Sequence, residues 1–94
     1  MPISFAMRVS VPPDVMVQEV AGESVLLNLK SERYFGLDDV GTVMWRSLTT
    51  LPTIQATYDR LLGEFDVQAD QLRRDLNDLV ENLVAHGLVE VAAN

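Results

Sequence analysis

Residues 25–45 constrain the fold more than any other part of this chain. The run VLLNL at 25–29 alternates with the period of two that is typical of a strand. The polar residues 30–33 predict a turn, and the run YFGL at 34–37 predicts a short strand that ends where a helix begins. Because this strand is short and comes last in a small sheet, we expect it to be an edge strand. An edge strand leaves backbone N–H and C=O groups without partners, and an extended peptide can pair with them.

Another strand is predicted before this stretch. Residues 14–20 (DVMVQEV) alternate well enough for a first strand, and a glycine-containing turn at 21–23 leads back into residues 24–29. These two strands would form an antiparallel hairpin, to which residues 34–37 add a third strand. Three helical segments follow. We therefore expect an α+β domain, a three-stranded antiparallel sheet followed by three helices, as in winged helix-turn-helix domains.

The predicted helices carry recognisable boundaries. Asp38 and Thr53 are expected to be the N-caps of the first two helices, because their side-chain oxygens can accept a first-turn N–H. Gly41 is a poor helix former in the first turn, which predicts that another group packs there too closely for a Cβ. The third helix is expected at 69–86, and Gly87 suits the left-handed position just after it.

The two ends of the chain are less regular. Pro2, Pro12 and Pro13 interrupt any regular element, so residues 1–13 are expected to be a loosely ordered N-terminal segment. The folded domain would then cover residues 14–94. Residues 88–91 (LVEV) are compatible with either a short terminal strand or an extended tail.

The apolar residues of the third helix cover an arc of about 140° around its axis. They are Leu72, Leu76, Leu79, Val80, Leu83 and Val84. We expect the four leucines to face the core, and Val80 and Val84 to line one wall of a groove. Arg73 and Asn77 share that flank of the helix, and the strand at 33–37 would form the opposite wall. The alternative is that Val80 and Val84 are simply core residues.

The aromatic residues divide between core and surface. Tyr34 and Phe35 are neighbours on a strand and therefore point to opposite faces. One of them should belong to the core, and the other is free to line a site. Trp45 is the only tryptophan, and we expect it in the core because large aromatic side chains dominate the packing of small domains.

Composition limits the environment in which this chain works. Its 94 residues suffice for one domain with one modest core. No apolar run approaches the roughly 20 residues that span a bilayer, and the first residues lack the pattern of a signal peptide. The absence of cysteine fits a reducing compartment. We therefore expect a cytoplasmic protein without a membrane partner.

Charge argues against a nucleic-acid partner. Seven basic residues stand against fourteen acidic ones, a net charge of −7. Nucleic-acid binders use basic surfaces, because neutralising phosphates supplies much of their affinity. The one basic pair, Arg73 and Arg74, has Asp70, Asp75 and Asp78 around it in the sequence.

The residues that catalysis needs are missing. The chain has one histidine, His86, which is expected to interact favourably with the dipole at the end of the third helix. Without cysteine it cannot build a usual structural zinc site, and no nucleophile accompanies the histidine. Neither a glycine-rich phosphate loop nor a calcium loop is present. We expect a binding domain with no catalytic residues, no cofactor and no metal, and not an enzyme.

The run LLNLKSERYFGLDDVGTVMW, followed by a leucine-rich helix that ends in HGLVE, resembles the PqqD-like family over residues 14–91. The most specific part is YFGLD at 34–38 with Gly41 and Trp45. These are recognition domains for the leader segments of ribosomally made, post-translationally modified peptides. The resemblance implies a three-stranded sheet on three helices. It also implies that a leader binds as an added strand on the third strand, against the third helix.

Within the family, the Leu-Asp-x-x-Gly-x-x-x-Trp pattern is most similar to the stand-alone leader-binding proteins of lasso-peptide clusters. That resemblance implies two kinds of partner, a precursor leader peptide and a maturation enzyme such as a leader protease, with a cyclase acting later. The chain differs from the pyrroloquinoline quinone type at residues 49–52 (TTLP), where that type tends to have an acidic-Gly turn. A peptide chaperone for that quinone, or for another radical-enzyme-modified peptide, is the alternative, and a winged-helix nucleic-acid protein is a remote one.

The resemblance carries over to Arg33, Tyr34 and Phe35 on the strand. An exposed edge could also pair with its own copy, so we expect either a monomer or an edge-strand dimer. The candidate peptide-binding residues are Arg33, Tyr34, Phe35, Gly36, Leu37, Arg73, Asn77, Val80 and Val84.

Overall fold

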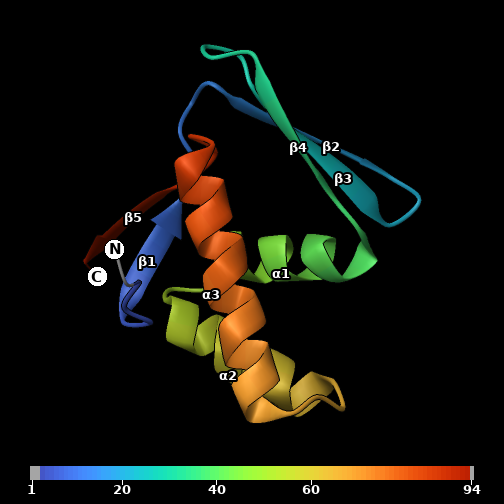
Figure 1. Cartoon of the computed structure of the whole chain (residues 1–94), viewed down its shortest axis with the longest axis vertical. Coiled ribbons are helices and arrows are strands. Elements are labelled where there is room, and N and C mark those ends of the chain that lie inside the picture. Colours follow the sequence, from blue (N-terminus) through green and yellow to red (C-terminus); the bar gives the residue numbers. More distant parts are fainter. Residues whose placement is uncertain (1–2, 94) are drawn as a thin grey trace.

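The computed structural model of this chain describes residues 3–93. Within these residues, five strands form two small sheets, and three helices lie between the sheets (Figure 1). In chain order the elements are β1 (Met7–Ser10), β2 (Val15–Val20), β3 (Glu23–Asn28), β4 (Arg33–Leu37), α1 (Asp39–Thr50), α2 (Ile54–Glu64), α3 (Ala69–Ala85) and β5 (Glu90–Ala93).

The expected three-stranded sheet is present and confirms the predicted α+β class. Its order is β2-β3-β4, with both neighbouring pairs antiparallel. Leu26 at the centre of β3 lies opposite Val17 on one side and Phe35 on the other, and it is fully buried. The inward face of the sheet therefore meets the core through alternate residues, as the period of two predicted.

The N-terminal segment differs from the expectation of loose order. Residues 7–10 form β1, which pairs antiparallel with β5 so that Val9 lies opposite Val91. Phe5 and Val9 are buried in the same core as the rest of the chain, so residues 3–10 belong to the folded body. Pro12 and Pro13 fall in the connection after β1, where a missing N–H breaks no ladder. Pro2 lies outside the described residues.

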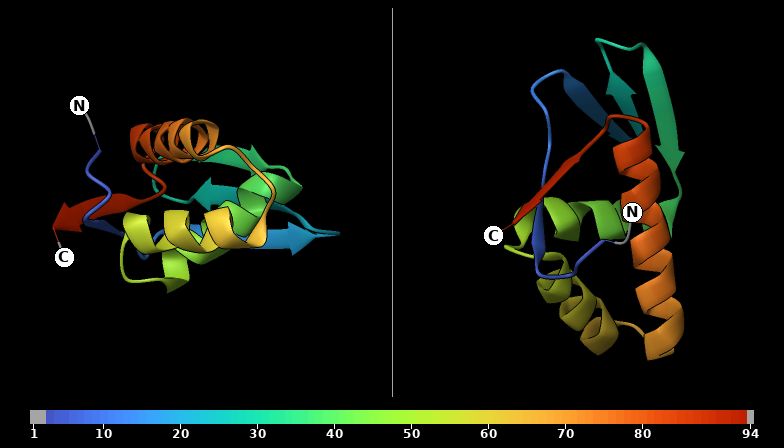
Figure 2. Two further views of the ribbon diagram at one scale, coloured as in Figure 1. Left: turned by 90° about the horizontal axis from the view of Figure 1, so that it is seen from below. Right: turned by 60° about the vertical axis from the view of Figure 1, so that its left-hand side comes forward.

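The pairing of β1 with β5 also shows that residues 90–93 form a strand, and it changes the predicted order of elements. The two strands of an additional sheet, β1 and β5, stand before and after the predicted three strands and three helices in the sequence. The terminal segment is a strand at Glu90–Ala93 and not an extended tail. Figures 1 and 2 show β1 and β5 on one side of the molecule and the three-stranded sheet on the other.

The helix boundaries follow the predicted caps. A carboxylate oxygen of Asp38 accepts a hydrogen bond from the backbone N–H of Gly41 at 2.7 Å, and the Thr53 hydroxyl accepts one from Ala56 at 3.0 Å. Gln68, at the start of α3, makes no side-chain cap bond. A Cβ on Gly41 would lie 3.2 Å from both the Asp38 carboxylate and a Leu37 methyl group, which confirms the predicted close approach.

The end of α3 is closed as its sequence predicts. Gly87 has a φ of 70°. Its N–H donates to the carbonyl of Val84, and the N–H of Leu88 donates to the carbonyl of Leu83 at 2.9 Å. This pattern satisfies the last carbonyls of the helix. The side-chain amide of Asn28 on β3 donates to the Gly87 carbonyl at 2.7 Å and so joins the sheet to the end of α3.

Replacing Gly87 with alanine should therefore cost stability. An L-residue in the left-handed region costs roughly 1–2 kcal/mol, and the new Cβ would also lie 3.2 Å from the Asn28 amide nitrogen. Urea denaturation should show this loss for Gly87→Ala. Gly63→Ala is the matched control, because Gly63 lies inside α2 with open space around its Cβ position and should gain up to about 1 kcal/mol. Equal changes in the two variants would contradict this assignment.

Candidate functional site

Both outer strands of the three-stranded sheet, β2 and β4, have an unpaired margin within residues 3–93, and the margin of β4 is the one that the sequence singled out. Within residues 3–93, β4 pairs with β3 and with no strand on its other side. Outward-pointing N–H and C=O groups of β4 are therefore available to a strand that approaches from that side. This confirms the prediction that the strand at 33–37 is an edge strand.

The side chains of β4 alternate between the core and the surface. Phe35 and Leu37 point inward, where Phe35 packs against the core and Leu37 is buried. Tyr34 points outward and is 73% exposed. The predicted division of Tyr34 and Phe35 between the two faces is therefore confirmed, and Trp45 is buried in the core as expected.

The start of β4 packs against the end of α3. The rings of Phe35 and His86 have centroids 5.1 Å apart and are tilted by 60°. The Nδ1 atom of His86 lies 2.7 Å from the carbonyl oxygen of Asn82, which holds the ring against its own helix. His86 is thus a packing partner of the edge strand. The sequence indicated only its position at the helix end.

The flank of α3 that faces β4 is not the one expected. The Arg73 guanidinium lies over the rings of Phe5 and Tyr58, 4.5 and 4.9 Å from their centroids. Asn77 lines a cavity with Phe5. Val84 lines another with residues of the β1–β2 connection and of β5, and with Asn28 and Lys30 at the turn before β4. Arg73 and Asn77 thus lie beside Phe5 of the N-terminal segment.

Val80 belongs to the core. Val80 is fully buried, which confirms the alternative prediction that it is simply a core residue. Leu79, which was expected to face the core, packs against it and is partly buried. Burial therefore removes Val80 from the expected groove wall, whereas the roles of Arg73, Asn77 and Val84 as peptide contacts stay predictions.

The contact between His86 and Phe35 indicates which flank of α3 lies nearest to β4. At 100° per residue, Asp75, Leu79 and Asn82 share the direction of His86 around the helix axis. Leu79 is the apolar member of this set, while Asp75 and Asn82 are exposed. Periodicity alone could not choose between the two flanks, because both border the same apolar arc.

The charged groups of the described residues make no metal centre. No group of three or more His, Cys, Asp or Glu side chains in residues 3–93 is placed to hold a metal ion. Within the same residues, no helix combines the length and the hydropathy that crossing a bilayer requires.

Comparison with known proteins identifies a family. Residues 23–89 match the model of a family described as coenzyme PQQ synthesis protein D (PqqD). No curated protein sequence matches the chain significantly.

Two solved structures have a similar fold. The chain is 30% identical, with a TM-score of 0.80, to a structure described as TbiB1 in complex with the TbiA(beta) leader peptide; the match covers 90% of this chain and 99% of that one. A structure described as lasso peptide synthetase B1 complexed with the leader peptide is 24% identical, with a TM-score of 0.76. This second match covers 90% of this chain and 98% of that one, and it shows the fold alone.

The two faces of β4 predict opposite effects of two neighbouring substitutions. Phe35→Ala should lower the free energy of unfolding by about 2 kcal/mol, since it removes a half-buried ring that contacts His86. Tyr34→Ala should change it by less than about 0.5 kcal/mol, because the ring is mostly in solvent. Thermal and urea unfolding of the two variants measure this difference. Similar losses would contradict the assigned faces.

Proposed function

The chain belongs to the PqqD family, and on that premise we propose that it binds the leader segment of a precursor peptide as an added strand on β4. The observation that carries this proposal is the open margin of β4, whose Phe35 packs against His86 at the end of α3. The structure at 30% identity is a complex with a leader peptide, which supports the same role here.

In this mode, backbone pairing supplies orientation and side chains supply selectivity. A hydrogen bond contributes only about 1 kcal/mol net, whereas micromolar binding needs about −8 kcal/mol. Apolar side chains of the leader must therefore contribute a large share. Phe35, Leu79 and His86 offer partly buried apolar and aromatic surface next to the strand.

The proposed role is presentation and not catalysis. By holding the leader, the chain would deliver a precursor peptide to a separate maturation enzyme, of which a lasso-peptide leader protease is the favoured example. The net charge of −7 disfavours nucleic acid as the partner of this winged-helix-like fold.

The family description favours one other function, the handling of a precursor peptide of pyrroloquinoline quinone. Calorimetric titration separates the two. The synthetic leader of a lasso precursor encoded beside the gene for this chain should bind with micromolar affinity or better. The quinone precursor peptide should bind at least tenfold more weakly. The reverse order would favour the quinone function, and failure of both peptides to bind would overturn leader recognition.

Strand addition predicts an alternating response to N-methylation of the leader. Successive amides of a strand point to opposite sides, so only every second N–H can face β4. Methylating the amides that face β4 removes donors and blocks close approach, and should weaken binding at least tenfold. Methylating the intervening amides should have little effect. Calorimetry with the two peptide sets checks this, and a uniform response would exclude strand pairing.

The two flanks of α3 should differ in their effect on leader binding. Leu79→Gln should weaken binding about tenfold or more, because Leu79 lies on the flank that carries His86 towards β4. Val84→Gln is the matched control, since Val84 lies on the other flank of α3, where it lines a cavity with the β1–β2 connection and β5, and this substitution should leave the affinity unchanged. Circular dichroism should confirm that both variants fold. A loss confined to Val84→Gln would restore the groove wall first expected from the sequence.

A further inference from the structure

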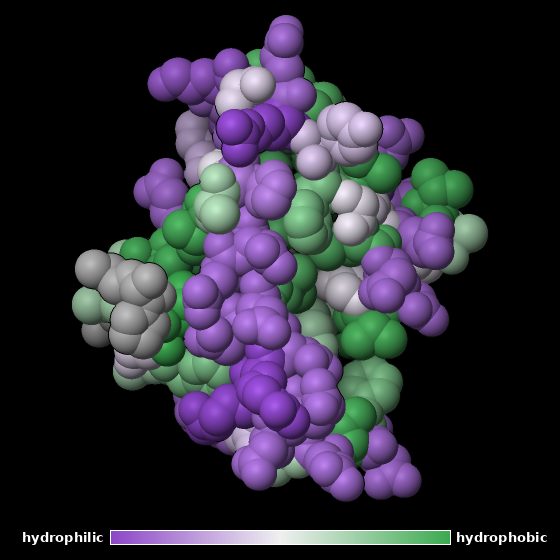
Figure 3. Space-filling model, in the orientation of Figure 1, coloured by the Kyte–Doolittle hydropathy of each residue, from purple (hydrophilic) through white to green (hydrophobic). Residues whose placement is uncertain are grey.

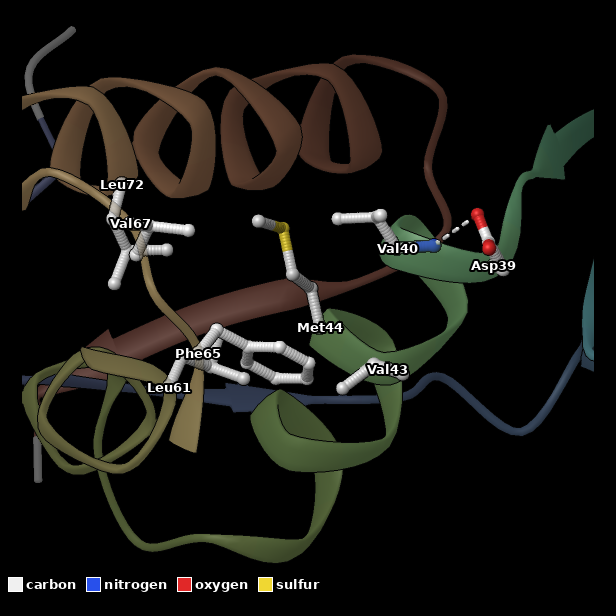
Figure 4. A pocket seen from close by; sticks show the side chains of 8 residues that line it. All are labelled: Asp39, Val40, Val43, Met44, Leu61, Phe65, Val67 and Leu72. Carbon is white, nitrogen blue, oxygen red and sulfur yellow. Dashed lines mark hydrogen bonds between the residues drawn. The ribbon is translucent and has the colours of Figure 1, made fainter. Parts of the chain in front are cut away.

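An apolar cavity opens beyond the end of β4. Its volume is about 220 Å³, and it lies between the first turns of α1, the end of α2 and the start of α3 (Figure 4). Its lining residues are Asp39, Val40, Val43, Met44, Leu61, Phe65, Val67 and Leu72.

The cavity has a closed floor and an exposed apolar rim. Met44, Leu61 and Leu72 are buried and belong to the core. Three rim residues are exposed, Val40 at 59%, Phe65 at 47% and Val67 at 43%. Single exposed apolar side chains are ordinary, but here Val40 of α1 and two residues of the α2–α3 connection, Phe65 and Val67, line one hollow. This arrangement leaves a site for an apolar group that the fold itself does not fill.

The cavity begins two residues after the end of β4 along the chain. β4 ends at Leu37, and Asp38 caps α1. The next two residues, Asp39 and Val40, already line the cavity. A peptide paired with β4 that extends past Leu37 would therefore reach Val40 within a few residues, since an extended chain advances about 3.3 Å per residue.

The surroundings of the cavity are acidic. In Figure 4 the Asp39 carboxylate lies at one end of the lining, apart from the apolar side chains, where it accepts from the N–H of Val40. Asp66 separates the two rim residues of the α2–α3 connection, and Asp70 lies in the first turn of α3. Glu64 is paired with Arg60. The remaining carboxylates favour an occupant with a positive charge beside its apolar group.

We propose that this cavity is a specificity site for one large apolar side chain of the bound leader, Leu, Phe, Tyr or Trp, next to a Lys or Arg. The side chain belongs to the leader segment that continues past the Leu37 end of β4. This inference rests on the proposed function, because the strand on β4 brings the segment to the cavity. Figure 3 shows that the outward face of α3 is polar, so that face itself offers no apolar site for such an anchor.

Selection from a displayed library of random peptides tests the inference without knowledge of the natural leader. Peptides enriched on the wild-type chain should contain a strand-forming segment. At a fixed distance from it they should carry one large apolar residue with a basic neighbour. In a selected peptide, replacing the apolar residue with alanine should weaken binding about 10- to 100-fold, the expected effect of losing one buried side chain.

Two rim variants and one control complete the test. Val40→Gln and Val67→Gln should abolish the preference for the apolar residue and leave the strand-forming segment enriched. Met16→Gln alters a similarly exposed apolar residue on β2. It should change neither the preference for the apolar residue nor the enrichment of the strand-forming segment. Double-mutant cycles between the rim variants and the peptide's alanine variant should show coupling of at least fivefold.

The possible outcomes separate this inference from the proposed function. Enrichment of strand-forming peptides without a preferred apolar residue would overturn the cavity's role and leave leader binding intact. A preference that survives both rim substitutions would place the anchor elsewhere and also overturn it. If the library yields no strand-forming peptides at all, strand addition on β4 and the cavity site fail together.

Discussion

The junction between β4 and α1 is the constraint on which the rest of this structure depends. Leu37 is buried, Asp38 caps the helix, and a Cβ on Gly41 would crowd both of them at 3.2 Å. The chain therefore leaves the sheet within two residues, and no other strand of residues 3–93 pairs with the outer side of β4. A hydrogen bond between the buried hydroxyls of Ser24 and Thr42 joins β3 to α1 just beyond the junction. The open margin is thus a result of how the helix begins.

Features encoded by neighbouring residues were predictable from the sequence. The period of two in β3, the caps at Asp38 and Thr53, and the glycines at 41 and 87 each depend on groups a few residues apart. Such local interactions act in the same way in any fold that contains them. The strand-turn-strand-helix order and the edge position of β4 follow from these signals together.

Features that depend on distant parts of the chain were not predictable. β1 is stabilised by β5, more than 80 residues away (Met7 lies opposite Ala93), and four residues with two prolines nearby carry no local strand signal strong enough to reveal it. The choice between the flanks of α3 depends on where Phe5 and Phe35 pack, which helical periodicity does not contain. The cavity beyond β4 combines three segments and has no pattern in any one of them.

The pairing of β1 with β5 has a practical consequence for joining this domain to other proteins. Met7 and Ala93 are opposite each other, so both ends of the folded body emerge at the same place, across the molecule from β4 (Figure 1). A tag, a tether or a fused enzyme attached at either terminus would leave the open margin of β4 unobstructed. The same architecture can therefore operate as a separate adaptor or as a module inserted in a larger polypeptide, with no redesign of its binding surface.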